Sequence, residues 1–556
     1  MTTTSPSSVV ATPAAVAGSP RSPLAHLGTM VAFTLRYNRI RLIVWLLLTV
    51  GMVAFIGSYY KGLDPQALQE LIIAGRVPSM QSLLGWITAA APGSAPLGAA
   101  VWIKSWMFVS LMLGIGMVFL VTHNLRADED TGRTELFRSR PLGLHSSLAS
   151  TLIMTVGLCL IAAIGIGAVG VAQQYGATLG STSGGDPDPL GSWVFGASIG
   201  AVGLIGIGVG VLTNELMSTS GGANGLGAAI LGLFYIVRMG TDIQNGDLTW
   251  ISPIGWAEKM DPWSHNLMWP LAAIIALTAV LIGVGWMIEA RRDYGGSLFA
   301  ARPGHASARR WMTSVTGLAV RLQRTAWIGW AVGIAVFALM LGSITPMMAD
   351  MFKSADIGGV DASSMLAVIG FLLSMISLGV CSFAVYSTST MALDDAHGLL
   401  EHQLSGAVSR VGWALKRLAV SFVGTLILLI ILCKVYALSY GAGMNDFGDF
   451  WTITALAFAF VPSMLVLMGV VVLGFGWWPR QAVAIGWALF GALWFIMILG
   501  QVLKLPEDVL NAMPFFSAAT TLANGPDWAT LIVTAIVGLA MIVIGLIGFR
   551  RRNVPA

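Results

Sequence analysis

The sequence predicts an all-α integral membrane protein with twelve transmembrane helices. Of its 556 residues, 56% are hydrophobic and 10% are charged, and the mean hydropathy is +0.80. A soluble chain of this length needs far more charge to cover its surface. Several apolar runs approach or reach the length of about 20 residues that crosses a bilayer. The predicted spans are 41–60, 100–122, 147–172, 191–217, 223–240, 266–289, 326–347, 364–390, 412–440, 450–475, 481–500 and 529–549.

The distribution of basic residues predicts the orientation of these spans. The loops that share a side with both termini hold 22 of the 30 Lys and Arg residues, and the opposite loops hold five. Loops rich in Lys and Arg stay in the cytoplasm. We therefore expect a multi-pass protein of the bacterial cytoplasmic membrane with both termini in the cytoplasm.

Composition also predicts where the chain divides. Residues 1–28 are rich in Ser, Thr and Pro and lack the pattern of a cleaved signal peptide, which predicts a disordered cytoplasmic tail. We expect a first six-span half over 29–290, a basic cytoplasmic linker over 291–310 and a second six-span half over 311–556. The three cysteines lie far apart within apolar runs, so neither a disulfide nor a metal site is indicated.

A dense run of charge follows the second predicted span. Residues 126–140 contain four acidic and four basic residues. Placing eight charges in the hydrocarbon core would cost roughly 20 kcal/mol at about 2.5 kcal/mol each. The run therefore belongs to a cytoplasmic loop, and the simplest interpretation is a solvated loop.

The same pattern recurs in the second half of the chain, which favours a more specific role. The segments "DEDTGRTELFRS" (128–139) and "DDAHGLLEHQLS" (394–405) both join the second and third spans of their half. The matched positions are Asp128 with Asp394, Glu129 with Asp395, Gly132 with Gly398, and Glu135 with Glu401.

A second repeat lies upstream, where "LRYNRIRLIVW" (35–45) matches "VRLQRTAWIGW" (320–330). Each segment has the composition of an amphipathic entry helix on the inner leaflet. The chain is therefore predicted to be two parallel six-helix repeats, each preceded by an amphipathic entry helix. A pseudo-two-fold axis along the membrane normal would then place a substrate pathway between the halves.

An amphipathic entry segment, a first span and an acidic loop with Gly and Glu between spans two and three resemble the ABC-2 type transporter permeases. The match is closest to the fused twelve-span permeases of bacterial polyketide-antibiotic exporters of the tetronasin type. The resemblance implies export of amphiphilic antibiotics or drugs. It also implies that each acidic loop forms a short coupling helix that docks on a separate ATPase subunit, with two ATPase copies per permease.

The implied coupling residues are Asp128, Glu129, Gly132, Glu135, Asp394, Asp395, Gly398 and Glu401. A short helix with acidic ends would offer carboxylates to basic residues of a partner. The chain has no G-x-x-x-x-G-K-[ST] motif, so ATP and Mg would bind in the partner and no cofactor is expected in this chain. The first loop carries four arginines, while the second carries His397 and His402, which predicts that the two docking sites are inequivalent.

Charged and aromatic residues within the spans are candidates for the substrate pathway. Intramembrane cations are functional candidates. The three cations Lys104, Arg238 and Lys434 lie near the outer ends of their spans, however, where their side chains could instead snorkel to the headgroups. Aromatic residues could line an adaptable apolar cavity or simply face lipid and neighbouring helices. The candidates are Lys104, Arg238, Lys434, Trp102, Trp106, Phe108, Phe371 and Phe383.

Three short motifs are rejected. "GIGAVG" (165–170) and "GASIG" (196–200) fall inside spans, where small residues serve helix packing. "HGLLEH" (397–402) has the wrong spacing for a zinc protease.

Other functions stay open at this point. An envelope-lipid exporter of the same type is a close variant. A secondary transporter would need acidic or histidine residues at mid-membrane depth, and none is found away from the span ends. A membrane-embedded enzyme would need paired acids or a metal cluster at one face, and only scattered carboxylates are present. The chain is therefore expected to be a transport subunit rather than an enzyme.

Overall fold

The computed structural model describes residues 22–75, 81, 84–85, 96–132, 142–143, 145–177, 188–242, 247–291, 296, 298, 307, 310–354, 362–406, 408–499, 515, 518, 521 and 525–552. The chain divides into two compact units, Met1–Pro303 and Gly304–Ala556, which we call unit 1 and unit 2. The boundary falls within the predicted linker. Residues 1–21 of the predicted tail lie outside the described residues, and residues 22–28 lead into the next helix.

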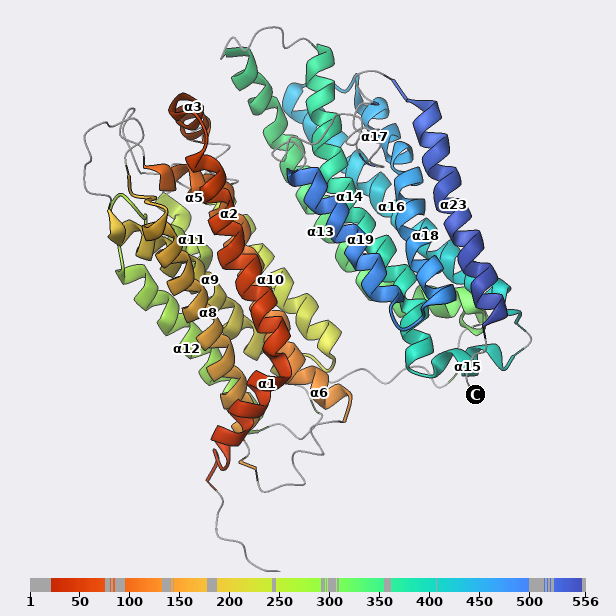
Figure 1. Ribbon diagram of the computed structural model, residues 1–556, viewed down its shortest axis with the longest axis horizontal. Coiled ribbons are helices and arrows are strands. Elements are labelled where there is room, and N and C mark those ends of the chain that lie inside the picture. Colours follow the sequence, from red (N-terminus) through yellow and green to blue (C-terminus); the bar gives the residue numbers. More distant parts are fainter. Residues whose placement is uncertain are drawn as a thin grey trace, which may run out of the picture. The chain divides into compact units, whose positions relative to one another are not determined.

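Unit 1 is a bundle of long helices (Figure 1). Its elements are α1 (Leu27–Leu46), a π-helical segment (Leu47–Gly51), α2 (Met52–Lys61), α3 (Pro65–Gly75), α5 (Leu97–Asn124), α6 (Arg126–Asp130), α8 (Ser146–Ala172), α9 (Pro189–Leu216), α10 (Ser220–Asp242), a 3₁₀ turn (Asp247–Ile251), α11 (Pro253–Glu258) and α12 (Trp269–Glu289).

The glycine-rich helix α9 is the centre of unit 1 and packs against α5, α8, α10 and α12. Its glycines let the neighbouring backbones approach closely. A β-carbon built on Gly196 would lie 2.1 Å from the carbonyl oxygen of Ala163, and one on Gly206 would lie 2.2 Å from that of Gly114. Small residues at close helix crossings are typical of membrane bundles. The packing interpretation of the glycine motifs in α8 and α9 is therefore confirmed.

Unit 2 is a second helical bundle. Its elements are a 3₁₀ turn (Arg310–Thr313), α13 (Val315–Ser354), α14 (Ala362–Ala396), α15 (Leu399–Leu404), α16 (Arg410–Met444), α17 (Phe450–Ala459), α18 (Val461–Trp477), α19 (Ala482–Leu499) and α23 (Trp528–Arg551). Helix α18 packs against α14, α19 and α23, while α16 packs against α13 and α17.

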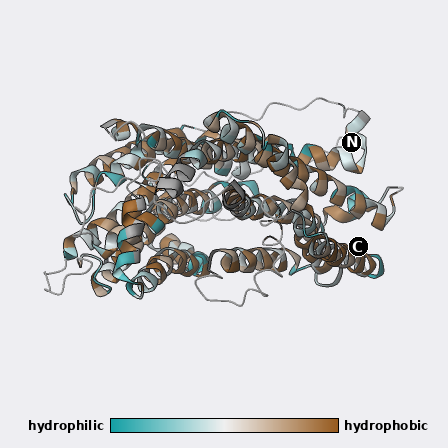
Figure 2. Ribbon diagram, turned by 90° about the horizontal axis from the view of Figure 1, so that it is seen from above, coloured by the Kyte–Doolittle hydropathy of each residue, from teal (hydrophilic) through white to brown (hydrophobic). Residues whose placement is uncertain are grey.

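Large apolar side chains cover the outside of these helices. Leu160, Ile161 and Ile164 on α8 are exposed, as are Val533 and Ile536 on α23. Hydrophobic residues run along the helices of both units (Figure 2). Such surfaces are stable only when lipid covers them. The expectation of a helical membrane protein is confirmed.

Eleven helices of the described residues are long and apolar enough to cross a membrane. The eleventh predicted span, 481–500, corresponds to α19 (Ala482–Leu499), which is apolar but is not counted among these eleven helices. The arrangement of twelve spans in two repeats therefore stays a prediction.

The predicted amphipathic entry helices are not separate elements. Leu27–Lys61 is one continuous helical segment, with the π-helical turn inside it, and α13 runs unbroken through 320–330 and the span that follows. No proline separates either basic segment from its span, so the hydrogen-bond ladder continues into the membrane helix. This part of the prediction is wrong.

Matched positions of the two halves nevertheless make the same contacts. Gln173 Nε2 donates to the carbonyl oxygen of Ala54 at 3.1 Å, and Ser439 Oγ donates to that of Leu339 at 2.6 Å. These residues occupy equivalent positions when the repeats found in the sequence are aligned. Each bond ties the first span of a unit to the end of its third span.

A second matched contact ties the first helix of each unit to the helix before the acidic loop. Asn38 Nδ2 donates to Asn124 Oδ1 at 2.6 Å in unit 1, and Gln323 Nε2 donates to Thr390 Oγ1 at 3.4 Å in unit 2. The partners differ in type but occupy equivalent positions. Both contacts support the interpretation of the chain as an internal repeat.

Candidate coupling helices and a buried charge cluster

The first acidic loop begins as the short helix α6, which lies at the end of unit 1 opposite α3 (Figure 1). Its first residue, Arg126, is only 2% exposed. One guanidinium nitrogen, Nη1, contacts Glu129 Oε2 at 2.8 Å and the carbonyl oxygen of Gly296 at 3.0 Å. Nε lies 3.8 Å from Asp130 Oδ1. Arg126 therefore holds the acidic residues of α6 and the start of the linker together.

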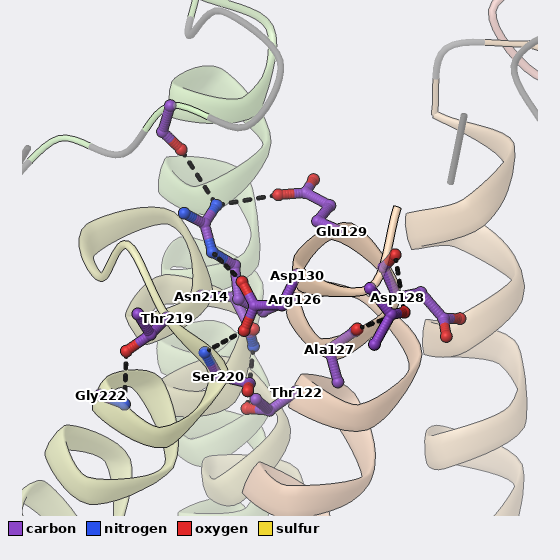
Figure 3. Close-up of polar contacts among 12 residues, drawn as sticks. Thr122, Arg126, Ala127, Asp128, Glu129, Asp130, Asn214, Thr219, Ser220 and Gly222 are labelled. Carbon is purple, nitrogen blue, oxygen red and sulfur yellow. Dashed lines mark hydrogen bonds and ion pairs between the residues drawn. The ribbon is translucent and has the colours of Figure 1, made fainter. Parts of the chain in front are cut away.

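Figure 3 shows how α6 is also tied to the start of α10. The backbone N–H of Ser220 donates to Asp130 Oδ2 at 2.7 Å. An acidic side chain at the first turn of a helix satisfies an open N–H group and complements the helix dipole. Movement of α6 would therefore act on α10 directly.

Gly132 ends α6 with a φ of +70°, and a β-carbon there would meet no atom within 4 Å. In the second loop Gly398 has a φ of +71° and is equally open. A left-handed backbone conformation favours glycine. The repeated glycine therefore makes the same turn in both units. Glu135, the fourth predicted residue of the first loop, lies outside the described residues.

The second loop contains α15, directly after Gly398. Asp394 forms a short ion pair with Arg417 of α16 and accepts a hydrogen bond from Gln403 Nε2 at 3.2 Å. Gln403 in turn accepts from Trp413 Nε1 at 2.8 Å. These contacts fix α15 against the start of α16.

Asp395 makes a different ion pair, with Arg552 at the end of α23. Arg552 Nη2 lies 2.7 Å from Asp395 Oδ2, and the same guanidinium lies over the ring of Phe475. The carbonyl oxygen of Arg552 also accepts from Arg410 Nη1 at 2.7 Å. The last helix of unit 2 is thus attached to its acidic loop.

These ion pairs change the expected roles of the acidic residues. Glu129, Asp394 and Asp395 form ion pairs inside their own unit, and their contact with a partner stays a prediction. The exposed side chains of the second loop include Leu399, Glu401, His397 and His402. A charge reversal at Glu129 or Asp395 would break an internal contact before it affected any partner.

The aromatic candidates separate into buried and exposed side chains. Trp102 and Trp106 are buried and stacked with ring centroids 4.5 Å apart, and Trp106 Nε1 donates to Ser198 Oγ at 2.9 Å. Phe383 is also buried. These three aromatic side chains are part of the buried packing of their units. Ser198 Oγ donates to the carbonyl oxygen of Phe195, so its hydroxyl is not arranged as a nucleophile.

The remaining candidates point outward or are not described. Phe108 is 48% exposed, and Lys104 and Lys434 are exposed. Lys104 and Phe108 lie four residues apart, on one face of α5. The side chain of Phe371 lies outside the described residues. Exposure fits the snorkelling interpretation for the two lysines.

Arg238 does not snorkel. Its side chain is 0% exposed, and Nε lies 2.9 Å from Asp242 Oδ2 and 3.2 Å from Glu258 Oε2. Nη2 donates to the carbonyl oxygen of Gln81 at 3.2 Å. The snorkelling prediction is wrong for this residue because two acidic side chains bind the guanidinium inside unit 1.

The rest of this charge cluster was not predicted from sequence. Asp242 also accepts from Thr249 Oγ1, and the guanidinium lies 6.0 Å from the ring centroid of Trp106 and 5.6 Å from that of Tyr235. The spacing of Arg238 and Asp242, four residues apart on one helix, was the available signal. Glu258 comes from the separate helix α11 and gave no such signal.

Among the described residues, no group of three or more His, Cys, Asp or Glu side chains could hold a metal ion. His397 and His402 belong to the exposed surface around α15.

Two comparisons with known proteins bear on function. Residues 312–550 match the family model described as the C-terminal domain of the multidrug efflux system permease Rv1217c. Over 537 residues the chain is 28% identical to the multidrug efflux system permease protein Rv1217c of Mycobacterium tuberculosis (strain ATCC 25618 / H37Rv), and the match covers 94% of each chain. Together with the apolar helices, these similarities support a multi-pass membrane permease for drug efflux.

Proposed function

We propose that the chain is the membrane permease subunit of an ATP-driven ABC-2 type exporter that moves amphiphilic antibiotics or drugs out of a bacterial cell. A separate ATPase subunit, in two copies, would dock on α6 and α15 at the cytoplasmic face. ATP and Mg would bind in that partner. The observation that carries the proposal is the repeated acidic helical loop with a left-handed glycine, Gly132 and Gly398.

The contacts around the two loops suggest how a docked partner would act on the spans. Asp130 bonds the start of α10, and Asp395 bonds the end of α23. A push on either loop would therefore reach a membrane-spanning helix through one ion pair or hydrogen bond. The internal acids would serve as mechanical links, while exposed residues would touch the partner.

Docking should depend on the exposed face of α15. Leu399 is 48% exposed, and Glu401 is exposed two residues away. A partner docked on this face of α15 would contact both side chains. The experiment is to purify the tagged chain from its native membranes in mild detergent and to measure the mass of the complex.

We expect two ATPase copies with the unchanged chain and none with the double variant Leu399→Asp, Glu401→Lys. The matched control is Asp449→Lys, an exposed acid that directly precedes α17 and lies past the end of α16 that is remote from α15. Equal recovery of the ATPase with both variants would contradict docking on α15.

One observation favours a second candidate, a secondary transporter that works without an ATPase. Asp242 and Glu258 are buried acidic residues, as ion coupling requires, although they lie at the end of α10 and in the connecting helix α11 rather than at mid-membrane depth. Transport by the purified chain in liposomes without ATP, abolished by Asp242→Asn, would establish this alternative.

A further inference from the structure

A cavity of about 370 Å³ opens in unit 1 beside the candidate coupling helix α6. Four helices line it: α1, α5, α6 and α10. The lining residues are Arg41, Trp45, Phe119, Leu120, Thr122, His123, Ala127, Ser220 and Asn224. A volume near this size accommodates a small molecule or the head of a larger amphiphile.

Hydrogen bonds hold the charged wall of the cavity in place. Arg41 Nη1 donates to Asn38 Oδ1 at 3.2 Å, and Asn38, which is fully buried, donates to Asn124 at 2.6 Å. The guanidinium also lies 5.7 Å from the centroid of the Tyr37 ring. Arg41 is therefore positioned by its neighbours although its side chain is exposed.

Close packing holds the apolar wall of the cavity in place. Trp45 lies against Gly116 of α5, where an added β-carbon would lie 2.3 Å from the indole ring. Only glycine leaves room for the ring at this place. Phe119, one turn further along α5, lines the same cavity and is partly exposed.

The lining selects a class of ligand by its charge. Arg41 is the permanently charged lining residue, and the lining contains no acidic side chain. Asn224 Oδ1 is buried and has no hydrogen-bond partner among the described residues, but an amide oxygen only accepts hydrogen bonds and does not attract an anion. The start of α10 adds little attraction because Asp130 already accepts from the Ser220 N–H. The guanidinium is thus the main binding group for an anion.

An exposed apolar surface next to the cavity could bind an apolar chain attached to that anion. Val44 precedes Trp45 on α1, Leu47 and Leu48 follow in the π-helical segment, and all three are exposed. Arg41, Trp45 and Leu48 lie on one face of the helix by their spacing of four and three residues. If the headgroup of an amphiphile binds Arg41, its apolar chain would therefore lie along Trp45 and Leu48.

The second half of the chain lacks the binding group. In the alignment of the two repeats, Trp45 matches Trp330, but Arg41 matches Ala326 and His123 matches Ser389. The aromatic residue recurs and the cation does not. Anion binding should accordingly be specific to unit 1.

We propose that this cavity is a binding site for an anionic amphiphile, with the acidic group on Arg41 and the apolar part against Trp45 and Phe119. The ligand is either an anionic phospholipid or a free anionic amphiphile of the exported class. The second source rests on the proposed function. In both cases the occupant would touch Ala127 of α6, so that occupancy of the site would reach the candidate coupling helix.

The test uses the full chain in phosphatidylcholine nanodiscs that contain a small fraction of phosphatidylglycerol with a photoreactive diazirine in its acyl chain. After illumination, mass spectrometry locates and quantifies the label. We expect labelling concentrated in 41–48 and 119–127, and about tenfold less in Arg41→Gln, as loss of a charge-assisted hydrogen bond implies. Arg39→Gln, on the same helix but not lining the cavity, should label like the unchanged chain.

Two further variants and probes separate charge from folding. Arg41→Lys keeps the positive charge and should retain most of the label, and a photoreactive phosphatidylcholine should label Arg41→Gln and the unchanged chain alike. Equal phosphatidylglycerol labelling of Arg41→Gln and Arg39→Gln, or labelling spread evenly over the apolar helices, would overturn the proposal.

Competition distinguishes the two sources of the ligand. Displacement by unlabelled phosphatidylglycerol alone assigns the cavity to a lipid headgroup, whereas displacement by dodecyl phosphate as well assigns it to free anionic amphiphiles. No ATPase is present in this experiment. A negative result therefore leaves the proposed ATP-driven function untouched, and absence of an ATPase partner leaves this binding site untouched.

Discussion

Removing the Arg238 side chain should strongly destabilise unit 1. Arg238 is completely buried, and Nε lies 2.9 Å from Asp242 and 3.2 Å from Glu258. In the variant Arg238→Met, both acidic side chains lose the guanidinium that compensates for their burial. Removing one partner of a buried ion pair costs about 3–5 kcal/mol, mainly because the remaining charge stays out of water.

The loss should appear as a lower midpoint of thermal unfolding in mild detergent. A domain of about 150–250 residues loses roughly 2–4 °C per kcal/mol, so we expect a decrease on the order of 10 °C. The matched control is Lys434→Met, which removes an exposed cation from a membrane helix and should shift the midpoint by no more than about 2 °C.

A compensated variant separates charge from side-chain packing. Arg238→Met combined with Asp242→Asn and Glu258→Gln removes the buried charges together, and it should recover much of the lost stability. If Arg238→Met melts like Lys434→Met, or if the triple variant is no more stable than Arg238→Met, the cluster does not stabilise unit 1 as argued.

Three further changes test other parts of the structure. Gly132→Ala or Gly398→Ala places a side chain in a left-handed conformation at a cost of about 1 kcal/mol, so amide hydrogen exchange in the adjoining α6 or α15 should accelerate roughly fivefold; unchanged exchange would refute the turn assignment. Trp106→Phe removes the donor to Ser198 and should cost about 1 kcal/mol of stability, while Ser198→Ala in the same background should add little. Gly206→Ala places a methyl group 2.2 Å from a backbone oxygen of α5 and should destabilise by about 1–3 kcal/mol; an unchanged unfolding midpoint would show that α5 and α9 are not in such close contact.

Hydropathy predicted most of the fold because each span is an apolar run long enough to be recognised by itself. The entry segments were mistaken for separate helices because basic residues in the sequence do not reveal whether the helix continues into the span.

The sequence predicted the backbone turn shared by the two acidic loops but not the side-chain contacts that the loops make. Glycine at matched positions indicated a shared turn, and Gly132 and Gly398 have nearly the same φ. The ion pair of Asp395 depends on Arg552, 157 residues away, and no local pattern connects them. Pairing between distant residues follows from packing of the helices, which the linear pattern does not contain.

The cluster around Arg238 was missed for the same reason. Its position near the end of a span favoured an exposed side chain, while the neutralising Glu258 comes from a connecting segment that carries no apolar periodicity. Burial of a charge depends on where the partner charge lies in space.

The most direct test of the account is the mass of the complex that the tagged chain forms when it is purified from its native membranes. We predict one chain with two copies of an ATPase subunit. The ATPase should be absent with Leu399→Asp, Glu401→Lys and present with Asp449→Lys. A chain that is recovered without an ATPase, and that moves drugs across a liposome membrane without ATP, would contradict the proposed ATP-driven export.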